Sequence, residues 1–68
     1  MMYHVECGDY KTFIDRPSPQ QAAVDALMVW EYKQEKPALS CITSVILKGK
    51  RKGYLYFSTS NLFNWHTL

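Results

Sequence analysis

The chain has 68 residues, of which 47% are hydrophobic, 15% aromatic and 21% charged, and its formal net charge is +2. This composition excludes an intrinsically disordered chain, and the length allows one small domain over residues 1–68. No apolar run approaches membrane-spanning length. The first residues have neither the basic n-region nor the apolar h-region of a signal peptide. We therefore expect a cytoplasmic protein with reduced cysteines.

The first two predicted elements are strands that pair as a hairpin. Residues 2–7 alternate in hydrophobicity, with Tyr3, Val5 and Cys7 on one face. Gly8-Asp9 is typical of a tight turn, and residues 10–15 form the return strand.

A helix is predicted after this hairpin. Ser18 has the hydroxyl of a good N-cap, and Pro19 suits the first helical position because its missing N–H has no partner there. Gln21 completes a capping box with Ser18, and Pro37 is expected to end the helix one or two residues before it. Apolar residues then recur at helical spacing, namely Ala22, Ala23, Ala26, Leu27 and Trp30.

Two further strands are predicted in the second half of the chain. Residues 39–47 and 54–59 are both apolar on their two faces, and strands of this kind need cover on both sides. A single helix covers one side. The last residues, 60–68, fit a turn of helix, a fifth strand or a loose end, and we expect either this segment or a second subunit to cover the other side.

These elements predict an α+β fold. The arrangement is a two-layer ββαββ domain, in which one helix covers one face of an antiparallel four-stranded sheet of order 2-1-3-4. Order 1-2-3-4, with a parallel central pair and a right-handed crossover, is the alternative.

Residue types that carry chemistry are present but poorly spaced. Four metal-ligand candidates, His4, Cys7, Cys41 and His66, show no paired spacing, so Cys7 and Cys41 are interpreted as core residues. The hydroxyls of residues 58–60 have no nucleophile-elbow pattern, the carboxylates are scattered, and a domain this small has little room for a ligand-sized cleft. We therefore expect no enzyme activity, no cofactor, no bound metal and no small-molecule substrate.

The first functional hypothesis is a binding or assembly module. The two-faced apolar sheet and the aromatic C-terminal segment favour a homo-oligomer, such as a homodimer, or a complex with another protein. Its alternative is that the C-terminal segment folds back and completes the monomer's own core. The residues expected at the interface are Ile42, Ile46, Leu55, Phe57, Phe63 and Trp65.

The second hypothesis is nucleic-acid binding through the basic tip of the second hairpin. Half of the eight Lys and Arg residues lie between positions 48 and 52, so the rest of the chain carries a net charge of −2. The segment 52–58 partly matches the RNP1 pattern of RNA-recognition motifs, whose aromatic side chains stack on bases. Its alternative is a solvated turn that keeps an apolar hairpin soluble. The candidate contacts are Lys48, Lys50, Arg51 and Lys52, with Tyr54 and Tyr56 for stacking.

Three short motifs carry a resemblance to a known group of proteins. They are Cys7-Gly8, the helix start Pro19-Gln20-Gln21-Ala22-Ala23 and the strand Tyr56-Phe57-Ser58-Thr59. Together they resemble short uncharacterised proteins encoded by tailed phages, over most of the chain. The resemblance implies no particular activity, and it points to a small accessory factor in a bacterial or infected cell.

Overall fold

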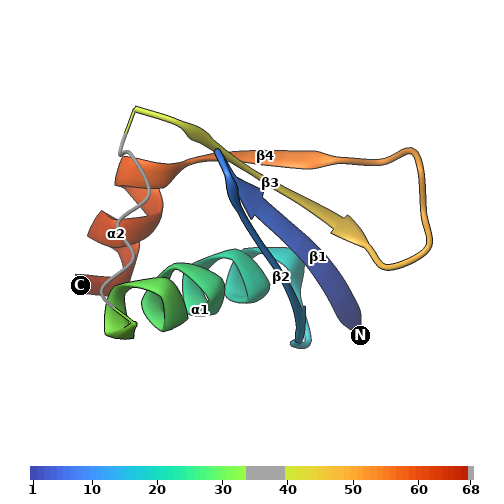
Figure 1. The fold of residues 1–68 in the computed structure, drawn as a ribbon, viewed down its shortest axis with the longest axis horizontal. Coiled ribbons are helices and arrows are strands. Elements are labelled where there is room, and N and C mark those ends of the chain that lie inside the picture. The colour runs from blue at the N-terminus through green and yellow to red at the C-terminus, as the bar shows by residue number, and fades with distance from the viewer. Residues whose placement is uncertain (34–39, 68) are drawn as a thin grey trace.

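The computed structural model describes residues 1–33 and 40–67, the last three of these by their backbone alone. The elements in chain order are β1 (Met2–Cys7), β2 (Tyr10–Asp15), α1 (Pro19–Tyr32), β3 (Ile42–Leu47), β4 (Leu55–Ser58) and α2 (Thr59–Thr67). The strands form one antiparallel sheet in the order β2-β1-β3-β4, and both helices lie on the same side of it (Figure 1). The predicted α+β fold and the strand order 2-1-3-4 are confirmed, and the alternative order with a parallel pair is wrong.

The first hairpin has the predicted bounds because its turn and its alternation agree. Gly8 has a φ of 61°, a left-handed conformation that glycine adopts without strain. The resulting register pairs Val5 with Thr12 on β2 and with Val45 on β3. Val5 is completely buried beneath the helices, so alternation along β1 fixes which face of the sheet is the core face.

Helix α1 begins where the capping residues predict, with one correction. The backbone N–H of Gln21 donates to Ser18 Oγ at 3.2 Å, and Pro19 is the first helical residue. The Gln21 side chain does not complete the capping box, because its amide donates to Asp25 Oδ1 at 2.8 Å, one turn further along. Asp25 also accepts from the guanidinium of Arg16, and this pair fixes the angle at which the chain enters the helix.

The end of α1 and the start of β3 also differ from the predicted bounds. Helix α1 ends at Tyr32 with Lys33 as its C-cap, earlier than predicted, and Pro37 lies outside the described residues. Strand β3 begins at Ile42, and Leu39, its predicted first residue, is likewise outside.

The core lies between the sheet and α1. Alanines at three positions of α1 allow the helix axis to approach the sheet closely, and Trp30 packs its ring 5.7 Å from that of Tyr10 at the far end. The five apolar positions predicted for the buried stripe of α1 are all buried, namely Ala22, Ala23, Ala26, Leu27 and Trp30.

The C-terminal residues form helix α2, one of the three conformations that the sequence allows. Thr59, predicted as the last residue of the fourth strand, is the first residue of α2. Leu62 is buried in the same core as α1, and Phe63 packs against that core. Helix α2 therefore lies on the same side of the sheet as α1, so the expectation that this segment covers the opposite face is not met.

A buried polar cluster holds the start of α2 against the sheet. The Thr59 hydroxyl lies 2.6 Å from the carbonyl oxygen of Cys41 and 2.8 Å from Thr43 Oγ1. Cys7 Sγ lies 3.4 Å from the same hydroxyl. This cluster connects β1, the start of β3 and α2, and it explains why the chain changes from strand to helix at Thr59.

Candidate nucleic-acid interface

The face of the sheet opposite the helices is uncovered by any described element, and we call it the open face. Its residues alternate with the buried ones, and the strand register brings Phe13, His4 and Ile46 into one row across β2, β1 and β3. Phe13 is exposed, so the open face presents aromatic surface to solvent at β2, whereas Ile46 on the same face is only 4% exposed.

One pair of stacked rings lies at the β1–β2 side of this face. The rings of His4 and Phe13 are nearly parallel, with centroids 4.7 Å apart. The ammonium nitrogen of Lys48 lies 5.4 Å from the Phe13 centroid, within the range of a cation–π contact. Lys48 belongs to the loop after β3, so this contact ties the basic loop to the open face.

A second stacked pair lies at the β4 edge. Tyr56 pairs with Ser44 in the strand register, which places its ring on the open face. Tyr54 stacks on Tyr56 with centroids 6.2 Å apart, so both rings lie on this face. The two side chains are 42% and 67% exposed, which leaves ring surface free for a further stacking partner.

Polar residues separate the two aromatic pairs. Glu6 pairs with Lys11 and with Ser44 across the middle of the sheet, and its carboxylate lies 3.6 Å from His4 Nε2. The open face is therefore a mixed aromatic and polar surface. Such a surface suits a polar partner with water at the interface better than an apolar protein partner.

The corner of the open face near the N-terminus carries a second acidic group. The amino group of Met1 donates to Asp15 Oδ1 at 2.7 Å. This hydrogen bond, together with the charge of the same ammonium, lowers the pKa of Asp15 below its ordinary value. The Met1 ammonium therefore favours the ionised form of the Asp15 carboxyl.

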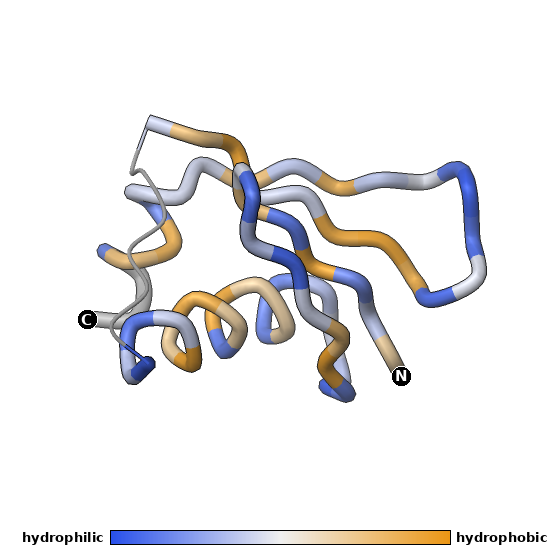
Figure 2. The backbone as a smooth tube through the Cα atoms, in the orientation of Figure 1, coloured by the Kyte–Doolittle hydropathy of each residue, from blue (hydrophilic) through white to orange (hydrophobic). Residues whose placement is uncertain are grey.

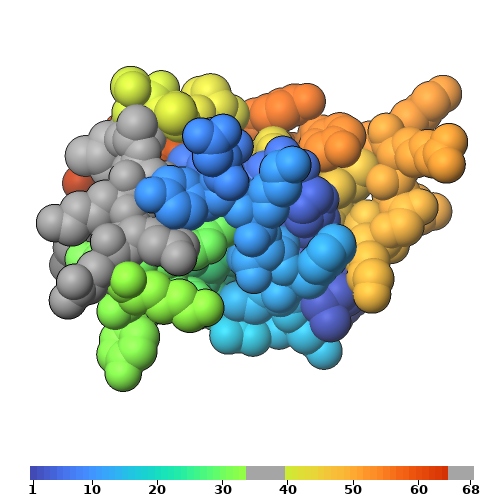
Figure 3. Space-filling model, in the orientation of Figure 1, coloured from blue at the N-terminus to red at the C-terminus, as the bar shows by residue number. Residues whose placement is uncertain are grey.

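The loop between β3 and β4 projects from the end of the molecule (Figure 3) and is strongly hydrophilic (Figure 2). The N–H of Lys50 donates to the carbonyl of Leu47 at 3.0 Å, which closes a turn with Gly49 at its third position. Gly49 and Gly53 have φ of 87° and 93°, values that other residues rarely adopt. The two glycines thus hold three consecutive cations in an outward bend.

The charges of this loop are not neutralised by the described part of the protein. Lys48, Lys50, Arg51 and Lys52 are all exposed, and none of them forms an ion pair with another described residue. Four cations are therefore available to an external anion, beside the exposed tyrosine pair.

The residues predicted for a protein interface do not form one surface. Ile42 and Ile46 belong to the open face, whereas Leu55 and Phe57 pair with Val45 and Thr43 and so face the helix side. This division follows from the two-residue period of the strands. Phe63 packs against the core on the helix side, and the side chain of Trp65 lies outside the described part of the chain.

Two residues of the open face were not predicted as site residues. His4 and Phe13 lie opposite each other in the register, and both alternate with core residues. The signal for them is present in the sequence, because a residue next to a buried strand position must face the other side.

The described residues contain no cluster of three or more His, Cys, Asp or Glu side chains that could hold a metal ion. Neither helix in the described part of the chain is both long and apolar enough to cross a membrane.

A scan against protein-family models finds no match to this chain, and searches of curated proteins and of solved structures find none either. The resemblance to short phage-encoded proteins therefore stays a prediction.

Proposed function

We propose that the open face and the basic loop bind single-stranded nucleic acid. The observation that carries this proposal is the position of the exposed Tyr54–Tyr56 pair beside four cations that form no ion pair with the described residues. Aromatic rings on an open sheet stack on unpaired bases, and Lys and Arg side chains contact the phosphates that join them.

The geometry favours a single strand over a duplex. Bases in a duplex are stacked on each other and expose only their edges, so flat tyrosine rings have nothing to stack on. The Glu6 carboxylate between the two aromatic pairs is a hydrogen-bond acceptor that base amino groups can reach, whereas it repels phosphate. This distribution of charge supports an arrangement with bases over the sheet and phosphates at the loop.

The test is a fluorescence anisotropy titration with labelled single-stranded DNA and RNA of about ten nucleotides, and with a duplex as comparison. If all four loop cations contact phosphates, the logarithm of the association constant should fall with the logarithm of salt concentration with a slope of about −3. Absence of binding to every single strand at low salt would remove the proposal.

Substitutions separate stacking from charge. Tyr56→Ala should weaken binding roughly five- to hundredfold and leave the salt slope unchanged, because stacking releases no counterions. Lys52→Gln should reduce the slope by about 0.7. The matched controls are Tyr32→Ala and Lys33→Gln at the end of α1 remote from the loop (Figure 1), where Tyr32 is 90% exposed; neither control should alter affinity.

Self-association is a second candidate, favoured by the exposed edge of the sheet. Strand β4 is an edge strand, and Leu55 on it is 46% exposed. An unpaired edge with an apolar side chain is a site where a second copy can add its own strand. Sedimentation at micromolar concentration distinguishes a monomer from a dimer. If β4 forms the contact between two copies, the Leu55→Lys variant should be a monomer.

A further inference from the structure

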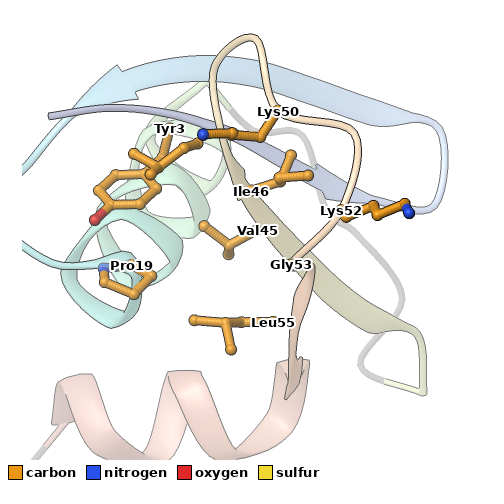
Figure 4. Close-up of a pocket in the computed structure, with 9 residues that line it drawn as sticks. Tyr3, Pro19, Val45, Ile46, Lys50, Lys52, Gly53 and Leu55 are labelled. Carbon is orange, nitrogen blue, oxygen red and sulfur yellow. The ribbon is translucent and has the colours of Figure 1, made fainter.

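A cavity of about 360 Å³ lies on the helix side of the sheet, at the loop end of β3 and β4 (Figure 4). This volume is at the lower end of the range for small-molecule sites, whereas the sequence predicts little room for a ligand-sized cleft. The residues that form its walls and mouth include Tyr3, Pro19, Val45, Leu47, Lys50 and Leu55.

The cavity exists because neither helix covers this part of the sheet. Helix α1 begins at Pro19 on one side of it, and α2 begins at Thr59, at the end of β4 away from the loop. Val45 forms part of the floor, and Leu55 is 46% exposed although its side chain faces the helix side. The result is an aliphatic surface that the protein leaves partly open to solvent.

The mouth of the cavity carries a cation, Lys50. The Lys50 side chain points toward Tyr3, whereas the Lys52 ammonium points away from the other lining residues (Figure 4). The lining contains no acidic residue, and Lys50 forms no ion pair with the described residues. A ligand there would meet one positive charge and no negative one.

We propose that this cavity binds a small amphipathic monoanion, with an apolar body against Val45 and Leu55 and a carboxylate at Lys50. Burial of the exposed aliphatic surface of Leu55 favours binding of the apolar body, and the Lys50 ammonium selects an anionic head group over a neutral or cationic one. The cavity lies on the opposite side of the sheet from the tyrosine pair, so this site is separate from the proposed nucleic-acid surface.

The test uses decanoate as the probe, followed by amide chemical shifts of the full chain in ¹H–¹⁵N spectra. Decanoate should shift the signals of Val45 and Leu55 in a saturable way below about 1 mM. The comparison ligands 1-decanol and decyltrimethylammonium have the same chain with a neutral and a cationic head group. Both should bind at least fivefold more weakly, roughly the value of one partly exposed charge pair.

Lys50→Met and Lys52→Met are a matched pair, because both lysines belong to the loop but only one points toward Tyr3. Lys50→Met should weaken decanoate about fivefold and leave 1-decanol unchanged, and Lys52→Met should alter neither.

Three results would overturn the proposal. They are the absence of saturable shifts at Val45 and Leu55, equal affinity for decanoate and 1-decanol, and equal loss of decanoate affinity in the two lysine variants. Spectra of each variant without ligand report the fold directly, so a misfolded variant is recognised before titration.

Discussion

Removal of the Thr59 hydroxyl should destabilise the protein more than any other single-atom change at the start of α2. The hydroxyl has one proton, which it donates to the Cys41 carbonyl at 2.6 Å. Its oxygen must then accept from its other two partners, the Thr43 hydroxyl at 2.8 Å and the Cys7 thiol at 3.4 Å. The hydroxyl is thus saturated, with one hydrogen bond donated and two accepted.

Thr59→Val keeps the shape of the side chain and removes all three hydrogen bonds. Each neutral hydrogen bond contributes about 1 kcal/mol, with less expected from the thiol, and a buried partner left unpaired adds a further penalty of about 1–3 kcal/mol. We therefore expect a loss of about 2–4 kcal/mol in the free energy of unfolding. Domains of this size have roughly 3–10 kcal/mol in total, so Tm should fall by about 10–25 °C.

The assay is urea unfolding followed by circular dichroism, with two controls. Thr59→Ser retains the hydroxyl and should lose only about 1 kcal/mol with its buried methyl group. Ser60→Ala removes the neighbouring hydroxyl, which contacts Ser58 Oγ at 3.1 Å in a partly exposed position, and should cost less than about 0.5 kcal/mol. A Thr59→Val protein as stable as Ser60→Ala would refute the reasoning.

Three further predictions follow from the fold. Because the Met1 ammonium lowers the pKa of Asp15, the stability from this pair is present above the ordinary value of 3.8 and should be lost as the pH falls through the lower, folded value. NMR titration of the Asp15 carboxyl should show this shift, and residues added before Met1 should abolish it. Gly53→Ala should lower the free energy of unfolding in urea by about 1–3 kcal/mol, because the φ of 93° is strained for alanine. No atom lies within 4 Å of the added Cβ, so this penalty comes from the backbone conformation and not from a steric clash. Trp30→Ala should cost about 3–5 kcal/mol and leave much of the protein unfolded at 25 °C by circular dichroism.

The elements that could be predicted from the sequence are those set by local signals. The first hairpin follows from alternation around Gly8, and the start of α1 follows from Ser18 and Pro19. Each of these signals acts over a few residues, so no knowledge of the rest of the fold is needed. The sequence favours the strand order 2-1-3-4 but also allows 1-2-3-4 with a right-handed crossover, and the structure decides between them.

Helix α2 could not be predicted in the same way. The segment before Thr59 is rich in aromatic residues, and Thr59 itself favours a strand as much as a helix start. The choice depends on the buried contacts with Cys7 and Thr43, which are distant in sequence. One local signal was available, because residues 58–61 are all of types that favour helix N-caps and precede the buried Leu62.

The candidate sites also differ in whether they depend on local sequence or on contacts between distant segments. The basic loop could be predicted because its charge is local, but the face of Tyr56 depends on its pairing with Ser44 across β3 and β4. The cavity near Leu55 could not be predicted, because it results from the positions at which both helices begin. A sequence pattern indicates which side chains a strand places on each face. It does not indicate which part of the sheet surface the helices leave uncovered.

The loop cations are also not equivalent, which offers a way to separate the two proposed sites. Lys48 contacts the Phe13 ring on the open face, whereas Lys50 points toward Tyr3 on the helix side. The two side chains have the same charge, so their long-range attraction for anions is nearly equal. Lys48→Met should therefore weaken oligonucleotide binding more than Lys50→Met does, and decanoate binding should show the reverse order. Equal effects of the two variants on both ligands would mean that the loop acts only through its total charge.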